Sequence, residues 1–282
     1  MLDIYIGIAV IAAVSAGLVL LALKIGARVS TTAQDFIALG TVGAIVVYIN
    51  VLQESAALAA VLPFSNLIVI GNWFPPLGAF LAGLAWKRIP GSRPRRTFFV
   101  CLLAGVSLYS AYARFMGELP ASSDSWRYGI CLQTSEYSCS AACAATLLKA
   151  HGIDATEAEM ESLCFTRSGK GTTWYGLFRG LKLKTAGTAW DVQIFKCTLD
   201  ELRAKSGGPA ILSVRLDPHP GIDPRYERKW GWTPGMQHAV VLFEFKSGSK
   251  AAMGDPSVGR ENWSIGALEE LWHGEGMRLV RR

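Results

Sequence analysis

Long stretches without a charged side chain in the first 115 residues constrain the fold more than any other feature of the chain. Residues 4–23 form an uncharged run that, as a helix rising about 1.5 Å per residue, would cross the roughly 30 Å hydrocarbon core of a bilayer. Further uncharged runs cover residues 36–53, 55–86 and 97–113. We therefore predict an α-helical transmembrane bundle over residues 1–115.

The runs place four helices near residues 4–23, 36–53, 66–86 and 97–113. We expect the pair Pro75-Pro76 to kink the third helix. A signal peptide fits the first run poorly, because no basic segment precedes it and Lys24 and Arg28 follow it. Three crossing helices with one re-entrant segment remain an alternative.

Positive charges in the short loops predict the orientation of the helices. Residues 87–96 contain five Lys and Arg side chains, and Lys24 and Arg28 lie between the first two runs. If both loops are cytoplasmic, four helices leave both termini outside. This arrangement predicts a multi-pass protein of a bacterial inner (cytoplasmic) membrane with the following domain on the extracytoplasmic side. Nucleic-acid or lipid binding is the alternative explanation of the basic loop.

The second half of the chain is predicted to be a soluble domain, with a linker at 116–128 and the domain at 129–282. It holds 20 Lys and Arg against 19 Asp and Glu, and this balance excludes a nucleic-acid binder. Helices are expected over 139–150, after the Thr156 capping box, and over 173–181. Strands are expected over 209–216, 238–245 and 250–253. Helices followed by strands indicate an α+β domain.

Cys139 and Gln133 are the first candidate pair for chemistry. Cys139 stands at the start of the predicted 139–150 helix, where the helix dipole and free backbone N–H groups lower a thiol pKa. A thiolate is the nucleophilic form of cysteine. The Gln133 amide could donate to an oxyanion beside the sulfur. A buried or disulfide-bonded cysteine and a solvated glutamine are the alternative.

His238 and Asp255 are the second candidate pair. His238 begins one predicted strand and Asp255 follows the next. If the hairpin between them closes symmetrically, residue 240 faces Asp255, and residues 238, 240 and 255 share one face of the sheet. A carboxylate at that place would fix the orientation and tautomer of the imidazole. A slip of one residue would separate the two side chains.

The number of cysteines in the domain predicts which disulfides an oxidising compartment would allow. The domain has five cysteines, and in an oxidising compartment these predict one free thiol, Cys139, and up to two disulfides. The sequence leaves the pairing open among Cys131, Cys143, Cys164 and Cys197. A zinc site is disfavoured because no Cys-x-x-Cys pair exists. We expect no metal, no cofactor and no ATP, since a Walker motif is missing.

An ordered set of motifs resembles the bacteriocin-processing cysteine peptidases, which are papain-like enzymes that cut leader peptides after a double glycine. The motifs cover residues 129–282 and are Gln133-x5-Cys139-x3-Cys143, Gly171-Thr172-Thr173, Gly208-Pro209-Ala210-Ile211, His238-Ala239-Val240-Val241-Leu242 and Gly254-Asp255-Pro256. The resemblance implies a papain-like α+β fold, here as a stand-alone membrane-anchored form. It also implies Cys139 as nucleophile, His238 as general base and acid, Asp255 as its orienter and Gln133 as oxyanion donor.

Two positions depart from the family pattern, because the family has Asp before the nucleophile and Gly after it, where this chain has Ser138 and Ser140. Residues 217–237, which lead up to His238, are interpreted as a lid over the cleft or as a structural loop. The leading hypothesis is a membrane-anchored cysteine peptidase that cleaves a peptide or protein, including a leader peptide. The alternatives are an inactive papain-like binding or assembly module and a peptidoglycan amidase or endopeptidase.

Overall fold

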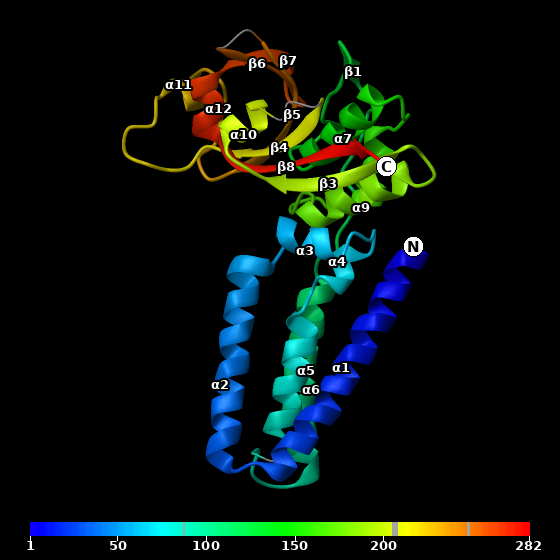
Figure 1. Ribbon diagram of the computed structural model, residues 1–282, viewed down its shortest axis with the longest axis vertical. Coiled ribbons are helices and arrows are strands. Elements are labelled where there is room, and N and C mark those ends of the chain that lie inside the picture. The colour runs from blue at the N-terminus through cyan, green and yellow to red at the C-terminus, as the bar shows by residue number, and fades with distance from the viewer. Residues whose placement is uncertain (87, 205–207, 247–248) are drawn as a thin grey trace. The chain divides into compact units, whose positions relative to one another are not determined.

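The computed structural model describes residues 1–86, 88–204, 208–246 and 249–282, and it divides into two compact units. The first unit is Met1–Met116 and the second is Gly117–Arg282 (Figure 1). The first is built of helices and the second combines helices with a sheet. Each unit is described below by itself.

Helices account for the regular structure of the first unit. Three segments are long and apolar enough to cross a membrane, namely Leu2–Arg28, Thr31–Leu52 and Leu67–Ala85. The predicted fourth span coincides with a helix of 20 residues that begins inside the basic segment, so its arginines lower its mean hydropathy. The helices are α1 (Leu2–Arg28), α2 (Thr31–Val47), η1 (Tyr48–Leu52), α3 (Ala56–Val61), α4 (Leu67–Ile70), α5 (Phe74–Ala85) and α6 (Arg93–Tyr112).

The proline pair does not kink a continuous helix, which corrects the expectation from the sequence. The chain leaves the helical path after α4, and Pro75 and Pro76 then occupy the first turn of α5. Proline fits there because the first N–H groups of a helix have no intrahelical partner to lose. The Asn72 Oδ1 atom accepts from the Phe74 N–H at 3.2 Å and fixes the new start.

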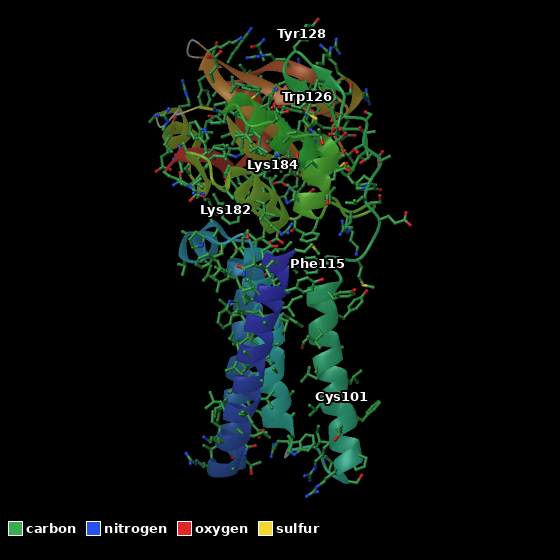
Figure 2. The ribbon with its side chains drawn as sticks, turned by 90° about the vertical axis from the view of Figure 1, so that its right-hand side faces the viewer. Cys101, Phe115, Trp126, Tyr128, Lys182 and Lys184 are labelled. Atoms are coloured by element: carbon green, nitrogen blue, oxygen red, sulfur yellow. The ribbon has the colours of Figure 1, made fainter. Side chains whose placement is uncertain are left out.

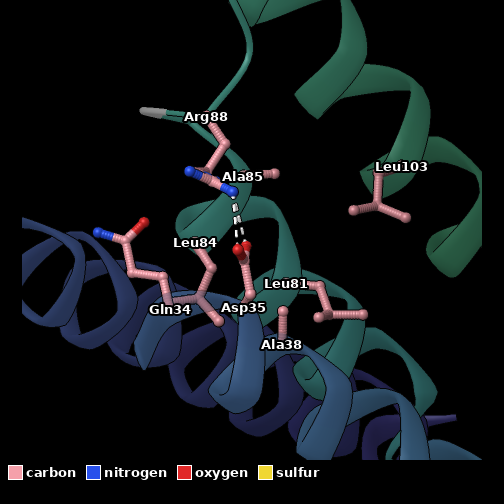
Figure 3. Close-up of a pocket in the computed structure, with 8 residues that line it drawn as sticks. All are labelled: Gln34, Asp35, Ala38, Leu81, Leu84, Ala85, Arg88 and Leu103. Carbon is pink, nitrogen blue, oxygen red and sulfur yellow. Dashed lines mark hydrogen bonds and ion pairs between the residues drawn. The ribbon is translucent and has the colours of Figure 1, made fainter. Parts of the chain in front are cut away.

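Both basic segments of the first unit lie at the same end of its helices (Figure 1). Lys24 and Arg28 are in the last turns of α1, and the described part of the second segment joins α5 to α6. At this end Arg88 contacts Asp35 of α2 at 2.7 Å, beside a cavity of about 280 Å³ walled by leucine and alanine side chains (Figure 3). Lys87 lies outside the described residues.

A six-stranded antiparallel sheet forms the centre of the second unit, in the order β3-β8-β4-β5-β6-β7. Its strands are β3 (Trp190–Lys196), β4 (Ala210–Arg215), β5 (Gln237–Lys246), β6 (Lys250–Asp255), β7 (Gly259–Ser264) and β8 (Trp272–Arg281). The three predicted strands correspond to β4, β5 and β6. A separate hairpin of β1 (Trp126–Arg127) and β2 (Ile130–Cys131) presents the exposed rings of Trp126 and Tyr128 (Figure 2).

Six helices accompany this sheet, and the first is the one that carries the site. They are α7 (Cys139–Ala150), α8 (Glu157–Cys164), α9 (Trp174–Thr185), α10 (Leu199–Ala204), α11 (Arg225–Arg228) and α12 (Ile265–Leu271). Helix α7 packs against β4 and β5 with an almost wholly buried set of alanine and leucine side chains. A second core lies among the strands, α10 and α12, around Leu212, Val240 and Met253. The unit is therefore α+β, as predicted.

The predicted Thr156 capping box is present, and two further residues bound the helices of this region. Glu159 N–H donates to the Thr156 Oγ1 atom at 3.1 Å, which caps the start of α8. Gly152 follows the end of α7 with a φ of 74°, a left-handed conformation that suits glycine at a helix C-terminus. Thr173 likewise caps α9 through its contact with the Gly176 N–H.

Candidate active site

Cys139 is the first residue of α7, as the sequence predicted. The residue before it, Ser138, is fully buried and fixes the approach to the helix. Its hydroxyl accepts from the Ser135 N–H at 3.1 Å and donates to the Ser135 carbonyl at 3.1 Å. The Ser138 hydroxyl thus holds the loop before Cys139 through hydrogen bonds to Ser135. The resembled family has an aspartate at this position. Ser140 Oγ lies 4.0 Å from the Cys139 sulfur.

His238 and Asp255 come together in the structure. The His238 Nε2 atom lies 3.0 Å from the Asp255 Oδ1 atom. The strands pair Val241 with Gly254, and continuing this register puts residue 240 opposite Asp255, as the symmetric hairpin predicted. A bulge between Leu242 and Glu244 shifts the register nearer the turn. Residues 247–248 of that turn lie outside the described residues.

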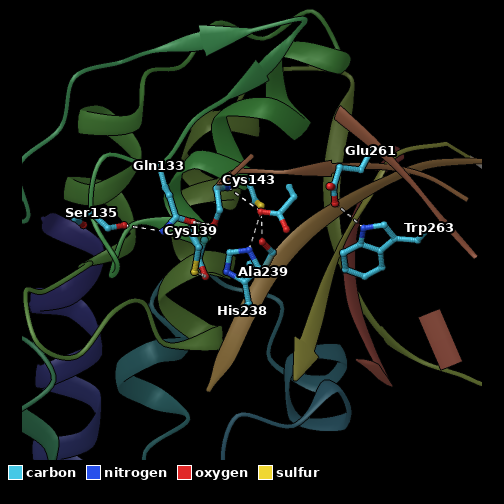
Figure 4. Close-up of polar contacts among 11 residues, drawn as sticks. Gln133, Ser135, Cys139, Cys143, His238, Ala239, Glu261 and Trp263 are labelled. Atoms are coloured by element: carbon cyan, nitrogen blue, oxygen red, sulfur yellow. Dashed lines mark hydrogen bonds and ion pairs between the residues drawn. The ribbon is translucent and has the colours of Figure 1, made fainter. Parts of the chain in front are cut away.

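The imidazole of His238 lies beside Cys139 (Figure 4) and its charge acts on the thiol, so Cys139, His238 and Asp255 form one group. Because Nε2 faces Asp255, Nδ1 is the ring nitrogen left for the sulfur. Burial by itself would raise the pKa of the Cys139 thiol, but the hydrogen bond and charge of His238 outweigh it and lower the pKa. The Ala239 N–H contributes in the same direction.

The charge of His238 is stabilised from two sides. Burial would lower the pKa of the imidazole, yet the hydrogen bonds to Asp255 and then to Cys139 raise it to about 10. Opposite shifts on a thiol and an imidazole favour the thiolate–imidazolium pair near neutral pH. In such a pair the thiolate is the nucleophilic form of cysteine, and the imidazolium has a proton to give.

Gln133 lies in the loop six residues before Cys139, and its amide is held at both ends. Its Nε2 atom donates to the Ser135 carbonyl at 2.9 Å, and its Oε1 atom accepts from Ser257 Oγ at 3.1 Å. Its backbone N–H donates to the Pro256 carbonyl at 2.8 Å. The turn after β6 thus fixes the loop that carries the glutamine.

A buried carboxylate supports the same loop from the other side, and sequence reasoning missed it. Glu157 is fully buried at the start of α8. Its carboxylate accepts from the N–H and the hydroxyl of Thr134 at 2.7 and 2.5 Å. A charged acceptor makes stronger hydrogen bonds than a neutral one. The signal in the sequence was the acidic first turn of the predicted helix, which a helix dipole alone also explains.

Trp232, in the segment 217–237 before His238, covers the imidazole. The two ring centroids are 5.8 Å apart with an interplanar angle of 84°, and Trp263 of β7 meets the other side of Trp232 at 5.8 Å. The Gly235 N–H donates to the Leu216 carbonyl at 2.8 Å, so the two ends of the segment lie together. The segment is therefore in contact with the candidate catalytic group.

The expected disulfides are not formed, which is a correction to the sequence analysis. All six cysteines of the chain lie in the described part, and none of them forms a disulfide. Cys131, Cys143 and Cys164 are buried, and burial raises the pKa of Cys131 and of Cys164 to about 12. The Cys143 thiol donates to the Ala239 carbonyl at 3.2 Å. These thiols are packed in the core and carry little thiolate at neutral pH.

The described residues contain no group of three His, Cys, Asp or Glu side chains arranged to hold a metal ion. A thiol at a helix N-terminus, an imidazole, a carboxylate and an amide donor together define the site of a cysteine peptidase class. Residues 127–216 match the Peptidase C39 family. The match confirms, over this segment of the chain, the resemblance inferred from the sequence. The matched segment includes Cys139 and ends before His238.

Comparison with curated proteins gives no significant match. Among solved structures, the chain is similar to the peptidase domain of Streptococcus ComA, a bi-functional ABC transporter involved in a quorum-sensing pathway, at 21% identity over 55% of this chain and 100% of that chain, with a TM-score of 0.43. A double-glycine motif protease from an AMS/PCAT transporter, in complex with its leader peptide, is 16% identical over 54% and 91%, with a TM-score of 0.41. A periplasmic domain of the Vibrio vulnificus EpsAB fusion protein is 17% identical over 55% and 51%, with a TM-score of 0.32.

Proposed function

We propose that this chain is a membrane-anchored peptidase that cleaves a peptide or protein substrate with Cys139 as the nucleophile. The contact of His238 with both Cys139 and Asp255 carries this proposal. Leader peptides that end in a double glycine are the first substrate class, because the matched family and the resembled motifs belong to peptidases of that kind. An inactive module would have no need of this charged, buried group.

The reaction begins with attack of the Cys139 thiolate on the carbonyl carbon of the scissile peptide bond. The negative charge that develops on the carbonyl oxygen is met by the Gln133 amide and by the N–H groups of the first turn of α7. The C–N bond then breaks as the imidazolium of His238 gives its Nδ1 proton to the leaving amine. The neutral imidazole next takes a proton from water, which attacks the thioester and frees Cys139.

The helices of the first unit serve as the membrane anchor in this proposal. Three of them meet the length and hydropathy of a span, and the proposal takes α6, which has 20 residues, as the fourth. The basic segments gather at one end of these helices, and basic loops stay cytoplasmic. With four crossings, the second unit is on the extracytoplasmic side of the membrane.

The test is cleavage of a fluorogenic peptide with a Gly-Gly sequence before the scissile bond by the full chain in detergent. Cys139→Ala should abolish turnover and labelling by a thiol-directed Gly-Gly peptide probe, since no other group can form the thioester. Cys197→Ala, which removes a thiol outside the site, should keep both. Cleavage retained in Cys139→Ala would falsify the assignment. New N-termini in cells with and without an active Cys139 would then identify natural substrates.

A further inference from the structure

Ser257, in the turn after β6, touches two members of the candidate site at once. Its backbone N–H donates to the Asp255 Oδ1 atom at 2.8 Å, the same oxygen that contacts His238. Its hydroxyl donates to the Gln133 Oε1 atom at 3.1 Å. One exposed serine thus joins the carboxylate that orients the imidazole to the amide that faces the oxyanion.

Two contacts together decide which way the Gln133 amide is turned, one at its donor end and one at its acceptor end. An amide has a donor end and an acceptor end, and its terminal torsion is soft. The Ser135 carbonyl can only accept, so it takes one N–H of Nε2, while the Ser257 hydroxyl supplies a proton to Oε1. With the oxygen held by Ser257, the second N–H of Nε2 is available to a substrate oxygen.

The other contacts of this loop do not replace that function. The Pro256 carbonyl holds the backbone N–H of Gln133, and Glu157 holds Thr134. Both fix the main chain, and the Ser135 carbonyl holds only the donor end of the Gln133 amide. Ser257 is the contact that fixes its acceptor end.

We propose that Ser257 is a positioning residue for the peptidase reaction, acting through Gln133 to present an N–H to the tetrahedral intermediate. This inference rests on the proposed function. Loss of a hydrogen bond that is made only with the developing charge lowers kcat and leaves KM nearly unchanged.

Two substitutions separate this role from a merely structural one. Ser257→Ala removes the hydroxyl and keeps the backbone N–H that serves Asp255. We expect kcat to fall about fivefold, the equivalent of one neutral hydrogen bond, with KM within about twofold of wild type. The pH profile of Cys139 alkylation by iodoacetamide should stay unchanged. Ser257→Thr restores a hydroxyl and should recover most of kcat.

The experiment measures kcat, KM and the alkylation profile for the full chain in detergent with the fluorogenic Gly-Gly peptide. Ser162→Ala, an exposed serine of α8, is the matched control and should equal wild type. If Ser257→Ala cleaves the peptide at the wild-type rate, the inference about Ser257 is wrong and the proposed function is unaffected. An equal loss in the Ala and Thr variants, or a shifted alkylation profile, also overturns it. A wild-type chain that leaves the peptide intact overturns the proposed function together with the inference.

Discussion

The Nε2 atom of His238 lies 3.0 Å from the Oδ1 atom of Asp255, across the pair of neighbouring strands β5 and β6. The contact is diagonal, because the register of β5 and β6 puts residue 240, two residues from His238, opposite Asp255. This hydrogen bond fixes the ring so that Nδ1 is directed to Cys139. The hairpin therefore sets the protonation of a sulfur on a helix about one hundred residues earlier in the chain.

Asp255→Asn tests this relationship through the pH dependence of the thiolate. In the wild type the reactive ion pair exists above the lowered pKa of Cys139 and is lost as pH rises through about 10, the pKa of His238. Asparagine keeps a hydrogen bond but not the charge, so the pKa of His238 falls and that of Cys139 rises. The range of pH in which the thiolate–imidazolium pair exists therefore becomes narrower at both ends.

The expected result for Asp255→Asn is a rate of Cys139 alkylation that is lower by about tenfold at pH values below the wild-type midpoint, since a rise of one unit in the thiol pKa is a tenfold loss of thiolate there. The midpoint of the profile should move to higher pH. The measurement is the rate of iodoacetamide labelling between pH 5 and 10, read at Cys139 by mass spectrometry. An unchanged midpoint would show that the carboxylate does not govern the thiol.

Trp232 should protect the imidazole that it covers. Trp232→Ala removes an edge-to-face contact worth roughly 1 kcal/mol, so we expect kcat/KM to fall about fivefold and Trp232→Phe to keep most of it. Trp230→Ala is the control, because Trp230 lies in the same segment and its ring packs on Tyr226 instead. The measurement is peptide cleavage at a series of pH values. Equal losses in the Trp230 and Trp232 variants would indicate a general effect on the segment.

The parts of the site that could be predicted follow from local rules. Cys139 stands at a helix start that the alanine-rich run predicts, and His238 and Asp255 flank one short hairpin, so alternation of side chains brings them together. Ser257 and Glu157 could not be found in the same way. Their partners are 124 and 23 residues away in sequence, and no local pattern distinguishes them from surface polar residues.

Strands β3 and β8 were missed for a related reason. The residues of β8, WHGEGMRLVR, include two glycines and three charged side chains and have no clear alternation. Its place between β3 and β4 depends on pairing with both neighbours. The close approach of Phe195 to Gly276 illustrates this, because any side chain at 276 would collide with the ring. Pairing with the neighbouring strands therefore outweighs the low strand propensity of these residues.

Gly176 should be intolerant of any side chain, because a Cβ atom there would lie 2.3 Å from the carbonyl oxygen of Cys164. That atom belongs to the backbone at the end of α8 and cannot move aside. We expect Gly176→Ala to lower the free energy of unfolding by about 2 kcal/mol or more. The measurement is urea unfolding of the full chain in detergent, followed by tryptophan fluorescence.

Gly266→Ala is the matched control for this prediction. Gly266 is also inside a helix, α12, but open space surrounds its Cα atom. Alanine there should stabilise the protein by roughly 0.5–1 kcal/mol, because glycine loses more backbone entropy on folding. A similar stability in both variants would contradict the close packing of α8 on α9.

The orientation in the membrane can be tested with single added cysteines in a chain that lacks the accessible thiols of Cys101, Cys139 and Cys197. Ser92→Cys, at the start of α6, and Ser162→Cys, exposed on α8, report the two sides. If the basic segments are cytoplasmic, a membrane-impermeant maleimide should label Ser162→Cys in intact spheroplasts and Ser92→Cys only after permeabilisation.

The buried thiols of Cys131, Cys143 and Cys164 should stay unlabelled in the folded chain, because a buried thiol with a raised pKa reacts slowly. The same property lets these thiols remain reduced in an oxidising compartment. Labelling of Ser92→Cys alone in intact spheroplasts would reverse the orientation and place the peptidase in the cytoplasm, and equal labelling of both would exclude a crossing by α6.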